Sequence, residues 1–220
     1  MALAPREIIE RLAQEYGEAP FRPHRDPMAE LVLTVLSQNT SDTNSGRAFV
    51  RLLAAFSDWD GLLAADVLAI AQAIQVGGLA RIKAPRLKKL LAQVREQTGG
   101  WDLGFLREMP LEEAKAWLRS LSGVGPKTAA CVLLFALGRP ALPVDTHVYR
   151  VARRLGLLPD GVGAEEAHAL LEEMLLPEEV FPLHIYLVRH GRRTCRARRP
   201  LCAQCPLRQG CPSAVLRAPD

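Results

Sequence analysis

The sequence predicts an all-α protein, and three observations support that prediction. Alanine and leucine dominate the 220-residue chain and aromatic residues make up only 5% of it, a composition that favours helices over a β-sandwich. Apolar residues recur at three- and four-residue spacing, and no run shows the sustained alternation of a strand. Glycines and prolines separate the periodic segments, so short connections are expected. With 49% hydrophobic residues, the chain can form one large or two small units with apolar cores.

Ten helices are expected from this spacing, and most of them are bounded by residues that interrupt a helix. They span residues 6–16, 28–38, 43–56, 64–75, 84–97, 111–121, 126–137, 145–155, 164–175 and 178–190. The interrupting residues, in chain order, are Gly77-Gly78, Gly99-Gly100, Pro110, Gly123 with Gly125, Gly138 with Pro140, Pro159 with Gly161, and Pro177. The segment 138–143 is therefore a candidate crossing between two lobes.

The N-terminal sequence MALAPREIIERLAQEYG has no apolar run of signal-peptide type, and its pattern indicates an amphipathic helix. No stretch approaches the roughly 18 to 20 apolar residues that a bilayer-spanning helix needs. We therefore expect no membrane partner and a soluble, cytoplasmic protein, associated with the nucleoid if the source is bacterial.

Positive charge is concentrated near the C-terminus. The net charge is only +4, but residues 180–218 contain eight arginines, the last of them Arg217, and no acidic residue. The rest of the chain holds 20 basic residues against 24 acidic ones. A basic tail on a near-neutral body favours a polyanionic partner, most simply nucleic acid. The alternative is a solvated arginine-rich terminus, so charge alone does not decide.

Four cysteines are spaced C-x6-C-x2-C-x5-C, which brings four thiols within 17 residues. Disulfides are not expected in an intracellular chain, so the cluster indicates either structural zinc or a [4Fe–4S] cluster, since both accept four cysteines. The spacing lacks the two separated Cys-x-x-Cys pairs of a zinc ribbon, which favours iron–sulfur. The fifth cysteine, Cys131, lies on an apolar helix face and is expected to be a buried packing residue.

Arg196, Arg198 and Arg199 fill the six-residue gap between the first two cysteines of this cluster. A bound metal would hold so short a loop in a fixed shape. Arginines on a fixed loop make good phosphate contacts, because little order is lost on binding. The arrangement favours DNA contact over a purely electron-transferring role.

The segment LSGVGPKTAACVLLF joins two amphipathic helices through a turn with glycines at 123 and 125. Glycines allow positive φ and let a phosphate approach backbone N–H groups. Pro126 suits the first helical position, and the helix start attracts anions. Lys127 follows on the first turn, where the dipole disfavours positive charge, and a neutral amine is a nucleophile. The alternative is a solvated or phosphate-binding lysine.

Asp145 follows Pro143-Val144 and precedes the helix expected in LPVDTHVYRVARRLGL. Aspartate is among the best N-cap residues, which is the structural interpretation. The functional one is a carboxylate that takes a proton or stabilises positive charge on a sugar ring. Both roles are compatible, since capping fixes the orientation that a catalytic carboxylate needs.

Taken in order, these motifs resemble the endonuclease III family of helix-hairpin-helix DNA glycosylases with AP lyase activity. The resemblance rests on LSGVGPKTAACVLL, on VDTHVYRVARRLGL with its aspartate 18 residues after the lysine, and on the cysteine spacing. The segments VLSQNTSDTN and GGLARIKAPRLKKLL also match, so the resemblance covers residues 28–211.

The resemblance implies two all-α lobes with a DNA-binding cleft between them. One lobe would be a six-helix barrel over residues 24–138, with its helix-hairpin-helix at about 112–137. The other would combine residues 1–23 with 139–220 and carry a [4Fe–4S] loop. The implied cluster ligands are Cys195, Cys202, Cys205 and Cys211.

The resemblance also implies roles at the lesion. Lys127 would be the Schiff-base nucleophile and Asp145 the catalytic carboxylate. Gln38 would fill the gap left by the flipped base, and Leu79 would be an apolar wedge in the opposite strand. The ordinary alternatives are a polar helix-end residue for Gln38 and core packing for Leu79. The expected activity is base excision repair by a monomer on double-stranded DNA that contains damaged pyrimidines or AP sites.

Three positions depart from the family pattern: Ser122 replaces a proline, Ala80 replaces an aromatic residue and Ser41 replaces an acidic residue. Ala80 and Ser41 bear on substrate range. Two alternatives stay open, namely a mismatch uracil, thymine or adenine glycosylase of the same superfamily, and a lesion-binding protein with weak catalysis. The adenine enzyme normally lacks the lysine, so Lys127 argues against it.

Overall fold

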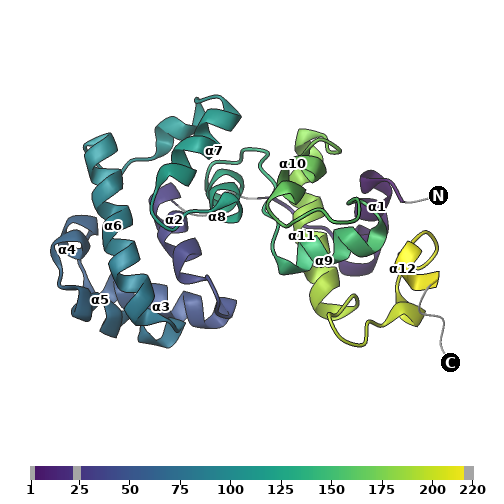
Figure 1. The fold of residues 1–220 in the computed structure, drawn as a ribbon, viewed down its shortest axis with the longest axis horizontal. Coiled ribbons are helices and arrows are strands. Elements are labelled where there is room, and N and C mark those ends of the chain that lie inside the picture. The colour runs from purple at the N-terminus through teal and green to yellow at the C-terminus, as the bar shows by residue number, and fades with distance from the viewer. Residues whose placement is uncertain (1–2, 22–25, 216–220) are drawn as a thin grey trace. The chain divides into compact units, whose positions relative to one another are not determined.

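A computed structural model describes residues 3–21 and 26–215, and this part of the chain is built from helices and turns without strands (Figure 1). The predicted all-α class is confirmed. The chain divides into two compact units. The terminal unit comprises residues 1–22 and 140–220, and the central unit comprises residues 23–139, where the sequence predicts 24–138. Arg217 lies outside the described residues.

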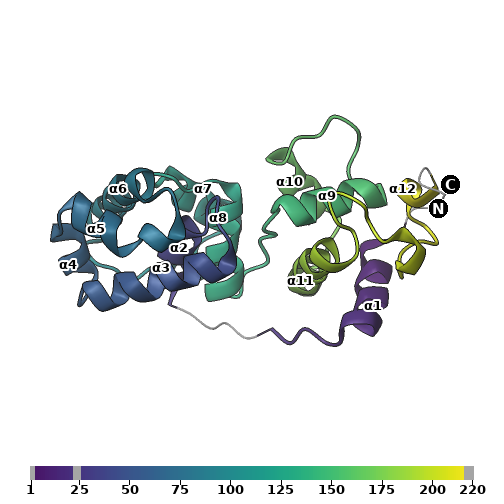
Figure 2. The ribbon, with the colours of Figure 1, turned by 90° about the horizontal axis from the view of Figure 1, so that it is seen from below.

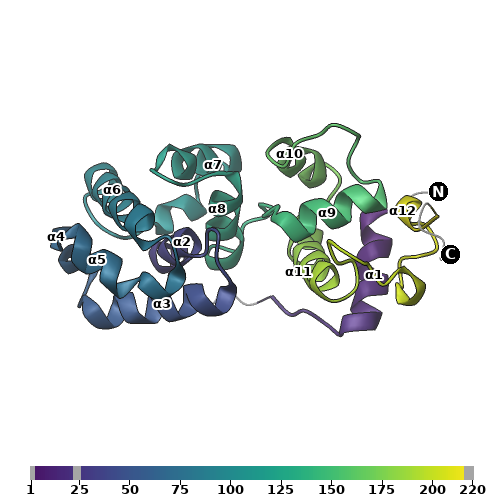
Figure 3. The same ribbon diagram turned by 60° about the horizontal axis from the view of Figure 1, so that its bottom comes forward.

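The central unit is organised around one apolar helix. Helix α2 packs against α3, α6, α8 and the π-helical turn η3 that follows α8 (Figure 3). Most of its side chains are buried, among them Met28, Leu31 and Leu36, because its sequence PMAELVLTVL is apolar on nearly every face. The helices are α2 (Pro27–Leu36), α3 (Asp42–Ala55), α4 (Trp59–Ala64), α5 (Val67–Ala73), α6 (Ala80–Thr98), α7 (Leu111–Ser120) and α8 (Pro126–Cys131), with η1 (Gln75–Gly77), η2 (Gly104–Arg107) and η3 (Val132–Ala136).

Local capping explains where the structure departs from the six helices expected in this unit. Asp66 accepts a hydrogen bond from the Leu68 N–H at 2.7 Å, and Asp58 accepts one from the Gly61 N–H at 2.6 Å. Asp58 starts α4, a helix that the apolar spacing did not predict, and Asp66 starts α5, which lies inside the predicted helix 64–75. The described residues of the unit therefore contain seven α-helices.

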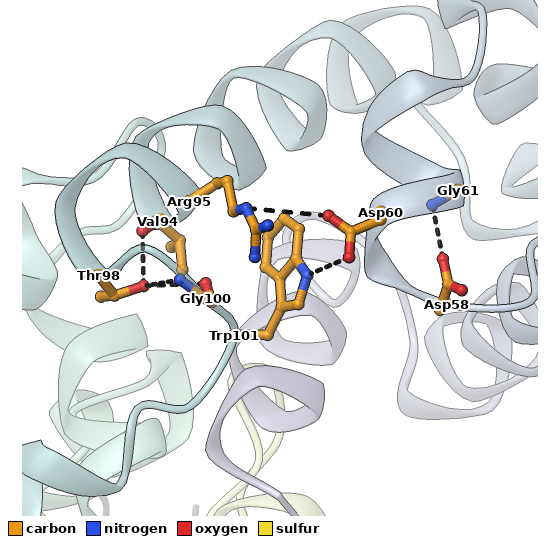
Figure 4. A network of polar contacts seen from close by, with 8 residues as sticks. All are labelled: Asp58, Asp60, Gly61, Val94, Arg95, Thr98, Gly100 and Trp101. Atoms are coloured by element: carbon orange, nitrogen blue, oxygen red, sulfur yellow. Dashed lines mark hydrogen bonds and ion pairs between the residues drawn. The ribbon is translucent and has the colours of Figure 1, made fainter.

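Helix α4 is held against the C-terminal end of α6 by a small polar network (Figure 4). The indole N–H of Trp101 donates to Asp60 at 3.1 Å, and Arg95 lies 3.9 Å from the same carboxylate. The Arg95 guanidinium also lies 5.7 Å from the centre of the Trp101 ring, within the range of a cation–π contact. This exposed network connects α4, α6 and the turn after α6 through side-chain contacts.

The terminal unit is built on helix α11, which packs against α1 and α9 (Figure 2). Pro177, expected to separate two helices, instead occupies the first position of α11, where its missing N–H costs nothing. The predicted helix 178–190 is therefore too short at both ends. The elements are α1 (Pro5–Tyr16), α9 (Thr146–Leu155), α10 (Glu166–Glu172), α11 (Pro177–Arg193), η4 (Cys202–Gln204) and α12 (Pro212–Val215).

A search of the described helices for membrane spans finds none with both the length and the apolar character to cross a bilayer.

Candidate functional site

The two glycines of the α7–α8 turn have different conformations. Gly123 has φ of 80°, and a Cβ on it would lie 2.2 Å from Cδ of Arg86, so only glycine fits. Gly125 has φ of −95° and open space where a Cβ would be. The positive φ that glycine allows thus occurs at Gly123 and not at Gly125. Neither its conformation nor its neighbours require a glycine at this position. Because Gly125 is exposed and has no side chain, another molecule can approach its backbone.

Lys127 lies on the first turn of α8, after Gly125 as N-cap and Pro126 at the first helical position. Its side chain is half-buried, and within the described residues no acceptor takes a hydrogen bond from its ammonium group. Cys131, further along the same helix, is 4% exposed, in line with the predicted packing role. A π-helical turn follows at Val132–Ala136, and π turns are frequent at functional sites.

Gln38 connects the segment after α2 to this hairpin. Its Nε2 donates to the carbonyl of Gly123 at 2.9 Å, and Arg86 donates to its Oε1 at 3.2 Å. These two bonds fix the orientation of the amide. Nε2 also donates to Oγ1 of Thr128 at 3.5 Å, so both of its donors have partners, and one lone pair of Oε1 remains for another molecule. Next to it, Asn39 has φ of 54°.

Leu79 is the N-cap residue of α6 and has φ of 51°, a left-handed conformation that is costly for a leucine. Its side chain is 49% exposed, and Ile82 one turn later is 54% exposed. Core packing is therefore not the role of Leu79. Its apolar side chain is therefore exposed to contact with another molecule.

Lys83 has a structural role that the sequence did not predict. It lies on α6, is only 2% exposed, and donates to the carbonyls of Leu36 at 2.7 Å and Gly77 at 3.0 Å. Burial lowers the pKa of Lys83 from its ordinary value. The helical spacing carries a signal for it, because Lys83 falls four residues before Leu87 on the buried face.

In the terminal unit, Asp145 is the N-cap of α9. Its Oδ1 accepts hydrogen bonds from the N–H groups of His147 at 2.8 Å and Val148 at 2.7 Å. The structural role predicted for Asp145 is therefore present. Because neither bond uses Oδ2, the cap fixes the carboxylate while one of its oxygens takes no part in capping.

The chain leading to Asp145 is held by side chains from α10 and α11. Glu172 accepts from the Leu142 N–H at 2.6 Å, and Nδ1 of His184 lies 2.8 Å from the carbonyl of Pro143. The Val144 N–H donates to Nε2 of His168 at 3.2 Å, so that nitrogen carries no proton. Its Nδ1 lies 3.0 Å from the carbonyl of Ala164, where an N–H donates.

The four clustered cysteines line one pocket together with apolar side chains of α9. Arg154 donates to Sγ of Cys195 at 3.3 Å. Burial raises the pKa of Cys205 to about 11 and also raises that of Cys211. In the described part of the chain, no three His, Cys, Asp or Glu side chains are grouped as a single metal ion requires.

The loop between Cys195 and Cys202 is fastened by arginines of α9. Arg154 donates to the carbonyls of Arg196 at 2.7 Å and Ala197 at 3.1 Å, and Arg150 donates to that of Cys195 at 3.1 Å. The sequence predicts a loop fixed by a bound metal alone, and these arginine hydrogen bonds are a second source of its fixed shape. The three predicted contact residues, all exposed, are Arg196, Arg198 and Arg199.

Comparison with known proteins places these features in a family. Residues 32–177 match the HhH-GPD superfamily of base excision DNA repair proteins. The chain is 36% identical over 207 residues to endonuclease III of Thermotoga maritima, covering 93% of this chain and 92% of that protein. It is 38% identical over 190 residues to a candidate DNA glycosylase of Arabidopsis thaliana, covering 86% of this chain but only 62% of the plant protein. A solved structure of a trapped endonuclease III–DNA covalent intermediate superposes with a TM-score of 0.83, at 30% identity over 98% of this chain and 99% of that one.

The chain therefore belongs to the HhH-GPD superfamily of base excision DNA repair proteins, with endonuclease III proteins among its relatives. The predicted family is confirmed, and so is the predicted class of enzyme, a base excision repair DNA glycosylase/AP lyase that acts on duplex DNA.

Proposed function

We propose that the chain removes oxidised pyrimidines from duplex DNA and then cleaves the strand, with Lys127 and Asp145 as its catalytic residues. The observation that carries this proposal is Lys127, a half-buried lysine at the start of α8 beside a turn with open backbone at Gly125. A lysine nucleophile is what distinguishes a glycosylase with lyase activity from one that only hydrolyses the glycosidic bond.

The reaction starts with extrusion of the damaged base, since C1′ cannot be attacked within the stack. Nζ of Lys127, as a neutral amine, bonds to C1′ while the bond from C1′ to the base breaks and the base leaves with its electron pair and takes up a proton. Ring opening gives an imine between Nζ and C1′. Loss of a proton from C2′ then expels the 3′ phosphate by β-elimination.

Asp145 supports this chemistry as a carboxylate that stabilises positive charge on the sugar or moves a proton. Its two backbone hydrogen bonds at Oδ1 hold it in one orientation, which is the preorganisation that electrostatic catalysis needs. Each proposed catalytic residue thus lies at the N-terminus of a helix, which fixes its backbone position.

Several exposed or partly exposed groups would contact the DNA. Gly123 and Gly125 would bring the hairpin backbone to a phosphate, with the N–H groups at the start of α8 as donors. Gln38 would use the remaining lone pair of its Oε1 on the base opposite the lesion, and Leu79 would enter the stack as a wedge. The exposed arginines at 196, 198 and 199 would contact phosphates further along the duplex.

The four cysteines line one pocket, and their spacing lacks the two separated Cys-x-x-Cys pairs of a zinc ribbon, which favours a [4Fe–4S] cluster over zinc. Cys195, Cys202, Cys205 and Cys211 would hold the cluster, which would staple the loop and need play no part in base removal. Work on DNA also favours the cytoplasm or nucleoid as the location.

Borohydride trapping tests the proposal. A duplex with a thymine glycol is incubated with protein and reductant, and the expected result is a covalent adduct that Lys127→Ala abolishes. Lys115→Ala, on the facing hairpin helix, is the matched control and should trap normally. An adduct that persists in Lys127→Ala would refute the nucleophile. Excision of mismatched thymine or uracil in preference to thymine glycol would instead favour the alternative glycosylase.

A further inference from the structure

The buried ammonium group of Lys83 lies where two helix ends meet. The carbonyl of Leu36 belongs to the last residue of α2, and that of Gly77 to the last residue of η1. Lys83 donates to both, at 2.7 and 3.0 Å. Carbonyls at helix C-termini lack partners within the helix and carry partial negative charge, so a cation between two such ends satisfies both.

Each of these carbonyls precedes a residue assigned to DNA by two positions. Leu36 is followed by Ser37 and Gln38, and Gly77 by Gly78 and Leu79. The segments that carry the proposed gap-filling residue and the proposed wedge are therefore hydrogen-bonded to the same side chain. We propose that Lys83 is a positioning residue that sets Gln38 and Leu79 relative to each other, so that both enter the duplex together during base extrusion.

The backbone on either side supports this assignment. Asn39 and Leu79 are two of the three non-glycine residues with positive φ in the described chain, and each lies within three residues of a carbonyl that Lys83 holds. Such conformations persist only where the surroundings determine them. A lysine buried at 2% exposure also carries a desolvation cost that an apolar residue of similar size would avoid. Fixing two strained loops is a benefit that an apolar residue could not supply.

The same helix offers a matched control. Lys88, also on α6, donates to the carbonyl of Ala65 at 2.5 Å, beyond the end of α4 and outside both loops. Lys83→Met and Lys88→Met each delete one ammonium and the bonds it makes to backbone carbonyls. Only the first deletion affects the segments that carry Gln38 and Leu79.

The experiment compares three readouts for each variant at equal folded fraction. These are single-turnover excision of thymine glycol from duplex DNA, fluorescence of 2-aminopurine opposite the lesion, and β-elimination at a preformed AP site. Lys83→Met should slow excision by at least about tenfold and weaken the fluorescence change, while β-elimination changes by less than about threefold, because that substrate has no base to extrude. Lys88→Met should behave as wild type in all three.

Lys83→Arg keeps the charge and the donors, so it covers the case in which Lys83→Met does not fold. Its longer side chain should displace the loops and slow excision several-fold with the same selectivity. Equal loss in excision and β-elimination would overturn the proposal, as would wild-type excision in either variant. The proposal rests on the proposed function, but the two can fail separately. A wild-type protein that extrudes the base without excising it would refute the function and leave the fluorescence comparison valid.

Discussion

The two units each hold a proposed functional segment through a side chain at a helix end, but the two ends have opposite polarity. In the central unit Lys83 donates to the carbonyls of Leu36 and Gly77, at the ends of α2 and η1. In the terminal unit Asp145 accepts from the N–H groups of His147 and Val148, at the start of α9. The difference follows from which helix end is presented, since helix C-termini expose carbonyls and helix N-termini expose N–H groups.

The two kinds of hydrogen bond differ in how they depend on pH. A lysine or an amide that donates to a carbonyl keeps its role over a wide range of pH. An acceptor such as Nε2 of His168 loses its role when it is protonated, and a carboxylate does so in acid. The segment before Asp145 therefore depends on the charge state of its neighbours, whereas the Gln38 and Leu79 segments depend on one buried cation.

The largest difference between the units should follow from removing a cluster ligand. Cys205→Ala should abolish bound iron, about four atoms per chain in wild type, and reduce the free energy of unfolding of the terminal unit by on the order of 5 kcal/mol or more. Cys131→Ala, in the central unit, should keep its iron. Iron analysis, colour and thermal unfolding monitor the effect. A colourless wild-type protein with one zinc per chain would contradict the cluster assignment.

Next in size is the loss of charge at Asp145. Asparagine can still accept both N–H bonds, so Asp145→Asn should keep the α9 cap within about 1 kcal/mol. Without the carboxylate charge, glycosylase turnover should fall by about 10² to 10⁴-fold. The same change at Asp66, which caps α5, should leave turnover unaffected. If Asp145→Asn keeps full turnover, the residue is only a cap.

Sequence periodicity was sufficient for most of the helices, because they bury apolar faces, and the family motifs indicated the candidate residues. It missed α4, and it failed where a single side chain determines the backbone conformation. Asp66 caps α5, which therefore begins at Val67 and not at residue 64, and the φ of Leu79 depends on contacts that periodicity does not encode. Lys83 was missed for a different reason. A lysine at a core position suggests a solvated residue unless the two carbonyls that it satisfies are known.

The hairpin glycines offer a smaller test that separates conformation from DNA contact. Gly123→Ala should destabilise the central unit by about 1 to 3 kcal/mol, because alanine there is strained and meets Arg86. Gly125→Ala meets nothing, but alanine is a poorer N-cap than glycine, so these effects oppose each other and stability should change by less than about 1 kcal/mol. If the backbone at Gly125 touches a phosphate, its DNA affinity should still fall about tenfold, or about 1.4 kcal/mol. Unaltered binding by Gly125→Ala would exclude that contact.

The smallest predicted effect concerns His168 and tests whether acceptors position Asp145. His168→Leu removes the acceptor for the Val144 N–H, and one such bond contributes about 1 kcal/mol, so kcat should fall about fivefold with little change in KM. His168→Gln places a carbonyl oxygen near the same point and should recover most of that loss. Single-turnover kinetics with thymine glycol DNA measure both variants, and thermal unfolding reports any general loss of stability. If Gln and Leu behave alike, the hydrogen bond is not what holds the segment, and packing against α10 is the remaining explanation.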